Sequence, residues 1–281
     1  MKNLFRKAFL GGFWAIAYKR KNDETFTLVP NQKSHWNADP FIVQRDNALY
    51  LFTEFYDTKK DIGRIAVSQL CNGEMLGIIE LIKSDTHMSF PFVFEIEGNY
   101  YLIPENSQSK TVPLYKFINF PNKLCFVRNI FNNVNYVDCF IEINKGSYYL
   151  IGYDDDKKSL FSCLLSHDFL PLGEVHYYGK SLVSRPAGAV INGKIRPSQY
   201  NEKKYGESIV LNDFAIKNSI IVEERKELIE ASKIRFSNSN KIPNKIHTIN
   251  ETKDYVVIDV FFEKVDLFRW FKMIRRKRHK K

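Results

Sequence analysis

Hydrophobic and aromatic residues recur along this chain as pairs of short runs separated by a polar turn. Three clear copies read ADPFIVQRDNALYLFTE from Ala38, FPFVFEIEGNYYLIPE from Phe90 and VDCFIEINKGSYYLIG from Val137. Two apolar runs around an Asn- or Gly-containing turn are the pattern of a β-hairpin. Two weaker copies follow, RPAGAVINGKIRPSQY from Arg185 and HTINETKDYVVIDV from His247. The pattern therefore predicts five hairpins in series.

The spacing of these hairpins predicts a β-propeller. Their first strands recur at intervals of 47 to 61 residues, anchored on Asp39, Pro91, Asp138, Pro186 and His247. Repeats of about 40 to 50 residues with four strands are typical of propeller blades. A β-sandwich of the same hairpins is the alternative. The recurrence of special residues at the start of each first strand favours the propeller, because there those residues converge on one mouth of the central channel.

The fifth hairpin lacks outer strands of its own. Two runs near the N-terminus, FWAIAY from Phe13 and TFTLV from Thr25, are unassigned and would complete its blade. Joining both ends of the chain in one blade removes two exposed sheet edges. We predict an all-β, five-bladed β-propeller over residues 1–263, with the last blade closed by N-terminal strands.

Charge singles out the C-terminus. The net charge is +10, but residues 264–281 hold nine Lys and Arg against one acid. The sequence VDLFRWFKMIRRKRHKK puts apolar and basic side chains on opposite sides of a helical wheel. We expect a short, basic, amphipathic helix that contacts the inner-membrane surface, with a docking helix as the alternative. Because the rest of the chain is nearly neutral, nucleic acid is not an expected partner.

The remaining composition narrows the function classes. The four cysteines are spaced singly, no cluster of ligands suggests a metal site, and no cofactor is expected. The sequence contains no apolar run of about 20 residues, the length needed for a membrane-spanning helix. The N-terminal segment lacks the cleavage site of a signal peptide. The expected localisation is cytoplasmic, peripheral at the inner membrane.

The starts of the first strands and the ends of the second strands supply the candidate site. Its candidate catalytic residues are Asp39, Asp138 and Glu105. Carboxylates bind sugar hydroxyls, and two of them beside an anomeric carbon can act as acid, base or nucleophile. The candidate substrate-binding residues are Trp36, Glu54, Arg64, Ser89, Arg185, Arg196, Gln199, Tyr205 and His247. Acids, arginines and aromatics around a funnel predict a carbohydrate ligand.

The same motifs resemble a family of bacterial propellers similar to the N-terminal domain of plant glucosamine inositolphosphorylceramide transferases. The resemblance rests on HWNADPFIV, LYLFTEFYD, SFPFVF, YYLIPE, VDCFIE and SRPAGAVINGKIRPSQ, and covers about residues 13–259. The ADP opening of the first repeat more distantly resembles the five-bladed arabinanases, levansucrases and invertases. That likeness implies a base or nucleophile at Asp39 and an assisting acid at Asp138.

The fourth repeat departs from those distant relatives, which carry a catalytic Glu in a later blade. Here it offers Arg185 and Arg196, and arginine binds phosphate through paired hydrogen bonds. The first hypothesis is therefore sugar transfer in bacterial surface polysaccharide or glycolipid biosynthesis, with a phosphate-bearing sugar, such as a nucleotide sugar, as donor or acceptor. The alternatives are a non-catalytic glycan-binding partner of a separate glycosyltransferase and a glycosidase-like hydrolase.

Overall fold

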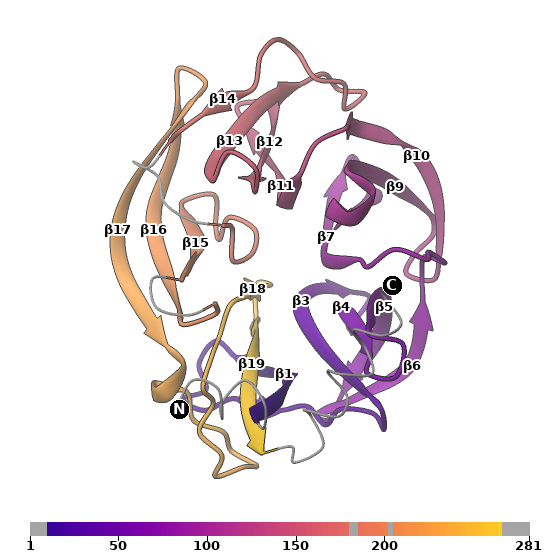
Figure 1. Cartoon of the computed structure of the whole chain (residues 1–281), viewed down its shortest axis with the longest axis vertical. Coiled ribbons are helices and arrows are strands. Elements are labelled where there is room, and N and C mark those ends of the chain that lie inside the picture. The colour runs from indigo at the N-terminus through magenta and orange to yellow at the C-terminus, as the bar shows by residue number, and fades with distance from the viewer. Residues whose placement is uncertain (1–9, 180–184, 202–204, 266–281) are drawn as a thin grey trace.

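Five antiparallel sheets form a closed ring around a central axis (Figure 1). The computed structural model describes residues 10–179, 185–201 and 205–265. Within them, helical structure is limited to two short 3-10 turns, η1 (Ser107–Ser109) and η2 (Ala231–Lys233). In this part of the chain no helix has the length and apolar character needed to cross a membrane. The predicted five-bladed propeller is confirmed.

The first three blades each contain four strands in chain order. Blade one consists of β3 (His35–Arg45), β4 (Ala48–Asp57), β5 (Ile62–Cys71) and β6 (Glu74–Glu80). Blade two consists of β7 (Ser89–Ile96), β8 (Asn99–Glu105), β9 (Thr111–Asn119) and β10 (Lys123–Asn132). Blade three consists of β11 (Tyr136–Asn144), β12 (Ser147–Asp154), β13 (Ser159–Leu165) and β14 (His176–Tyr177). These strands match the predicted apolar runs.

Blade four has a less regular inner edge. Its sheet contains β15 (Ile195–Tyr200), β16 (Ser208–Lys217) and β17 (Ile220–Glu230). The segment that precedes β15 meets it only through isolated bridges, Pro186 to Ser198 and Ile191 to Ile195. Pro186 has no N–H to donate to a ladder, and Gly188 has a φ of 142° that an extended strand does not adopt. The predicted first strand of this hairpin is therefore reduced to a loop.

Blade five combines the two ends of the described chain. Its strands are β18 (Ile249–Glu251), β19 (Tyr255–Val265), β1 (Leu10–Arg20) and β2 (Thr27–Leu28). β1 pairs with β19 along its whole length, from Leu10 opposite Val265 to Arg20 opposite Tyr255. The predicted closure by N-terminal strands is confirmed. The predicted basic helix falls on 264–281, of which 266–281 lie outside the described residues and the first two belong to β19.

Apolar side chains between the blades hold the ring together. The Phe41 ring of blade one lies 5.0 Å from the Phe90 ring of blade two, and Phe92 lies 6.1 Å from Phe140 of blade three. All four side chains are buried. Burial of aromatic surface is a main source of stability, and tilted ring pairs add to it. Each blade therefore depends on its neighbours for its core.

Candidate functional site

The inner strands of blades one, two and three share the same backbone irregularity. A β-bulge interrupts β3 between Ala38 and Phe41, β7 between Ser89 and Phe92, and β11 between Val137 and Phe140. The residues with left-handed backbone in these bulges are Asp39 (φ 47°), Phe90 (φ 44°) and Asp138 (φ 52°). Left-handed backbone is unfavourable for any residue with a Cβ, and such strain is concentrated at functional sites. Two of the three strained positions hold a buried aspartate.

Asp39 is held by groups from two other blades. One carboxylate oxygen accepts a hydrogen bond from Thr248 Oγ1 at 2.7 Å and lies 3.3 Å from His247 Nε2 of blade five. The other accepts from the backbone N–H of Phe90 in blade two at 3.2 Å. Burial raises the pKa of Asp39, and the nearby His247 partly opposes this effect.

Asp259, in the middle of β19, contacts both Asp39 and the residues that hold it. Its carboxylate accepts hydrogen bonds from the backbone N–H groups of Asp39, His247 and Thr248. It also lies 2.7 Å from His247 Nδ1. Burial lowers the pKa of His247, but Asp259 and Asp39 outweigh burial and leave that pKa raised. The two carboxyl groups on either side of the imidazole therefore favour its protonated form.

The Asp39, His247 and Asp259 side chains could also hold a metal ion. One ligand atom from each lies within 4.8 Å of the others, and all three residues are buried. Carboxylate oxygens and an imidazole nitrogen are common metal ligands. Among the described residues this is the group suited to a cation.

A second network joins blades two, three and four. Arg185 donates from Nε to Asp138 at 2.6 Å and from Nη2 to both Asp138, at 3.1 Å, and Glu105, at 3.2 Å. Gln199 donates to Asp138 at 3.1 Å and to the carbonyl of Pro186 at 3.0 Å. The Asp138 carboxylate therefore receives three charge-assisted or polar hydrogen bonds, which fix its orientation.

The two networks lie close enough to influence each other electrostatically. Burial raises the pKa of Glu105 to about 8, with Asp138 and Asp39 adding to the rise and Arg185 opposing it. Burial likewise raises the pKa of Glu54 well above its usual value, and Asp39 contributes. We call these residues the central polar cluster: Asp39, Glu54, Glu105, Asp138, Arg185, Gln199, His247, Thr248 and Asp259. It contains more carboxyl groups than cations, so proton uptake by Glu54 and Glu105 lowers its negative charge.

Glu54 reaches the cluster from β4 and extends outward to His87. Its Oε1 lies 3.4 Å from His87 Nε2. His87 Nδ1 accepts the backbone N–H of Gly63, so in the neutral ring the proton lies on Nε2, facing Glu54. Ser89 lies at the same end of its blade, buried and opposite Glu105 across the β7–β8 ladder. Tyr205 is about half exposed, and its ring lies 5.3 Å from that of His247.

Three predicted binding residues have their recorded contacts with groups outside the cluster. Arg196 is completely buried and pairs with Glu223 of β17, its Nη2 lying 2.9 Å from Oε2. This corrects the expectation that Arg196 faces a ligand, because its charge is used inside blade four. Trp36 stacks on Tyr56 at 4.1 Å on blade one. Arg64 lines a separate pocket of the same blade.

One family matches more than half of the chain. Residues 26–169 match the family described as the N-terminal part of glucosamine inositolphosphorylceramide transferase 1. The chain belongs to this family. The matched segment runs from β2 to just beyond β13, and so contains Asp39, Glu54, Glu105 and Asp138 of the central polar cluster.

Curated relatives of the transferase N-terminal family are plant proteins. The chain is 34% identical over 128 residues to glucosamine inositolphosphorylceramide transferase 1 of Arabidopsis thaliana. This match covers 43% of the present chain and 16% of the Arabidopsis protein. It is 35% identical over 92 residues to the protein of the same name from Oryza sativa subsp. indica, covering 31% and 12%. The matched part is thus less than a fifth of the length of either relative.

Solved structures with the same fold include glycoside hydrolase propellers. A β-xylosidase superposes with a TM-score of 0.56 at 12% identity, covering 82% of this chain and 92% of the other. The catalytic domain of an α-L-arabinofuranosidase from Coprinopsis cinerea gives a TM-score of 0.51 at 12% identity, covering 88% and 97%. At these identities the likeness establishes the propeller fold of the family member and nothing of its chemistry.

The sequence patterns did not identify Asp259, which accepts hydrogen bonds from the backbone of Asp39 and from that of its neighbours His247 and Thr248. The available signal was an acid in the middle of the apolar run YVVIDVFF, where an unpaired charge would be costly. Such an acid is expected to face buried donors. Glu223, the partner of Arg196, carried no comparable signal, because it lies in the charged run EERKE of β17.

Proposed function

We propose that this family member is a carbohydrate-active propeller that transfers a sugar, with the central polar cluster as its active site. The observation that carries the proposal is the pair of strained bulges that hold Asp39 and Asp138 buried and close enough to interact electrostatically. Membership of a family named after a glycosyltransferase supports the theme of sugar transfer. Buried carboxyl groups with displaced pKa values are the usual acids and bases of such chemistry.

The environments of the carboxyl groups suggest different roles. Asp39 is held by Thr248 and His247 and would act as the base that accepts a proton from the acceptor hydroxyl. Glu105, with a pKa of about 8, is largely protonated near neutral pH and would donate a proton or hydrogen bond to the leaving group. Asp138 is occupied by Arg185 and Gln199 and would position Arg185.

We further propose that the donor or acceptor carries phosphate and that the product is a bacterial surface polysaccharide or glycolipid. Within the cluster this proposal rests on Arg185, since Arg196 is buried with Glu223. Arg185 is partly exposed, and arginine suits phosphate oxygens. Its two carboxylate partners already offset its charge, so phosphate binding would depend on protonation of Glu105.

The test is a conservative exchange of the acids. Asp39→Asn and Asp138→Asn, made singly and together, should lower surface-glycan output in cells by roughly a hundredfold or more, as loss of a general base does. Asp46→Asn is the matched control, because Asp46 lies exposed in the β3–β4 turn of the same propeller. Unchanged glycan output with a folded double variant would exclude sugar transfer by this cluster.

A second candidate is a non-catalytic glycan-binding partner of a separate glycosyltransferase. The observation that favours it is the full hydrogen bonding of Asp138, together with the absence of an acid from the described part of the blade-four hairpin. The same variants distinguish the two. If the protein is a non-catalytic binding partner, the variants should lose affinity for the glycan. Neither the purified wild type nor the purified variants should then release product from any sugar donor.

A further inference from the structure

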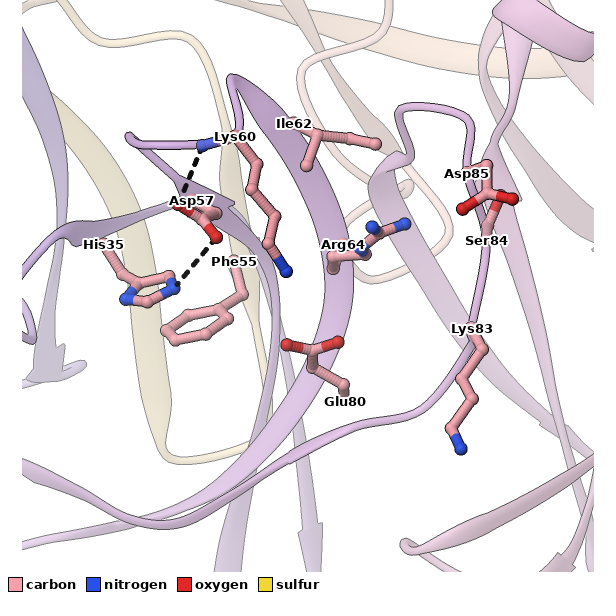
Figure 2. A pocket seen from close by; sticks show the side chains of 10 residues that line it. All are labelled: His35, Phe55, Asp57, Lys60, Ile62, Arg64, Glu80, Lys83, Ser84 and Asp85. Atoms are coloured by element: carbon pink, nitrogen blue, oxygen red, sulfur yellow. Dashed lines mark hydrogen bonds and ion pairs between the residues drawn. The ribbon is translucent and has the colours of Figure 1, made fainter.

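A separate pocket lies on blade one, outside the central polar cluster. Figure 2 shows it between the ends of the blade-one strands and the segment that follows β6. Its volume is about 320 Å³, which suits a single sugar ring with a substituent. None of the carboxyl groups of the central polar cluster lines it.

Three cations line this blade-one pocket without an acidic partner. Lys60 comes from the β4–β5 turn, Arg64 from β5, and Lys83 from the segment after β6. No described carboxylate lies within 4.0 Å of any of these three charged groups. The Arg64 Nη1 atom is buried and has no hydrogen-bond partner among the described residues. A buried N–H group without a hydrogen-bond acceptor is costly, so these cations favour an anionic ligand.

Asp57, the pocket acid on β4, is engaged by backbone groups and interacts with Lys60 electrostatically without forming an ion pair. Asp57 accepts the backbone N–H groups of Lys59 at 2.8 Å and Lys60 at 3.1 Å, and lies 4.0 Å from His35. Figure 2 shows the Lys60 side chain turning away from Asp57 and toward the strand that carries Arg64. The amino group is therefore presented to the pocket.

The remaining lining groups suit a sugar. Phe55 stacks on His35 with ring centres 4.3 Å apart and planes 3° from parallel, and both rings line the pocket. Such an aromatic wall can pack against the apolar face of a pyranose. Glu80 at the end of β6 and Asp85 beyond it make no ion pair with described residues, so their oxygens can accept sugar hydroxyls.

We propose that the blade-one pocket binds a phosphorylated monosaccharide, with the phosphate on Lys60 and Arg64, the ring on Phe55 and the hydroxyls on Glu80. This ligand satisfies both signs of charge and the aromatic wall at once, which neither a bare anion nor a neutral sugar does. It is a second site, so it stands or falls independently of the chemistry proposed for the central polar cluster.

Isothermal titration calorimetry at low ionic strength tests it, with glucose 1-phosphate, glucose and inorganic phosphate as the three probes. Glucose 1-phosphate should bind more tightly than either of the others. Lys60→Gln and Arg64→Gln should each weaken it roughly tenfold or more, the effect of losing a charge-assisted hydrogen bond. Glu80→Gln should weaken glucose 1-phosphate and leave phosphate unchanged.

Lys59→Gln is the matched control, because Lys59 is the exposed neighbour of Lys60, has the same charge and does not line the pocket. Asp39→Asn should also leave binding intact, which separates this site from the central polar cluster. The proposal is overturned if wild type does not bind glucose 1-phosphate, or if Lys59→Gln weakens it as much as Lys60→Gln. It also fails if inorganic phosphate binds as tightly as glucose 1-phosphate.

Discussion

Single residues in unfavourable backbone conformations determine where the acids of this propeller lie. A left-handed conformation costs about 1–2 kcal/mol for a residue with a Cβ. Asp39 and Asp138 adopt it in equivalent bulges, and their carboxylates recover this cost through hydrogen bonds with other blades. Phe90 occupies the same position in blade two and is completely buried among aromatic rings instead. The same left-handed bulge therefore places a packed aromatic side chain in blade two and a hydrogen-bonded carboxylate in blades one and three.

Glu105 should make stability depend on pH. Its folded-state pKa of about 8 lies above the usual 4.5, so the folded protein binds the extra proton and loses stability as pH rises between these values. Glu105→Gln removes that proton. The variant should therefore gain stability relative to wild type from pH 5 to pH 8, measured as the difference in urea midpoint.

Glu74→Gln, at an exposed position at the start of β6, serves as the control for this pH series. Its difference from wild type should stay constant across the same range. A constant difference for Glu105→Gln as well would mean that Glu105 is ionised throughout.

The Arg196–Glu223 pair should be structural. Arg196→Met leaves the Glu223 carboxylate buried without its partner and should cost about 3–5 kcal/mol in the free energy of unfolding. Arg196→Met combined with Glu223→Leu should recover most of that loss, because an apolar pair of similar volume needs no desolvation of charge. Equal losses in the single and double variants would contradict this role.

At the residue scale, the sequence predicted the acids better than the arginines. The hairpin alignment alone puts Asp39 and Asp138 at equivalent strand starts. Arg185 and Arg196 flank one hairpin and look alike in sequence, but Arg196 meets an acid from β17, 27 residues further along the chain. Ion pairs between residues so distant in sequence depend on how the strands align in space. The hydrophobic pattern does not determine that alignment for a charged strand such as β17.

At the element scale, hairpins and outer strands follow from alternation of apolar and polar residues, and blade four shows the limit. The segment before β15 has the pattern of a strand, yet it runs against blade five. The backbone N–H of Ile249 donates to the carbonyl of Ala187 at 2.7 Å. Close approach of two backbones replaces the regular ladder here, and the sequence marks it only by Pro186 and Gly188.

Gly188→Ala should therefore weaken the junction between blades four and five. An added Cβ would overlap the carbonyl oxygen of Ile249, and the φ of 142° is itself unfavourable for alanine. We expect a loss of about 2–4 kcal/mol in the free energy of unfolding, typical of forced backbone shifts. Gly193→Ala, in the turn of the same hairpin, has open space around it and should cost only about 1 kcal/mol of backbone strain. Similar losses in both variants would show that backbone strain alone is responsible.

At the scale of the whole molecule, the closed ring was predictable because open sheet edges are unfavourable. The distribution of charge leads to a further proposal at this scale: the basic residues 266–281 attach the propeller to an anionic membrane surface. Eight of the nine C-terminal cations lie in this segment, and each basic residue near such a surface contributes about 1 kcal/mol.

Deletion of residues 266–281 should release the protein from vesicles that contain anionic lipid, measured by co-sedimentation. The deletion leaves β19 intact, so the melting temperature should stay close to that of the full chain. Wild type should also be released as the salt concentration rises. Retained binding by the truncated protein would show that the membrane contact lies outside residues 266–281.

The pairing of β1 with β19 has a consequence for how the protein is made. During translation β1 leaves the ribosome long before its partner β19, which is synthesised more than two hundred residues later. β2 follows closely and pairs with one edge of β1, but the edge that faces β19 stays open until then, a situation that favours wrong pairing or aggregation. Blades one to three can assemble in order of synthesis, whereas the ring can close only when β19 has emerged. The emergence of β19 from the ribosome, or a chaperone that shields β1, would therefore set the timing of ring closure.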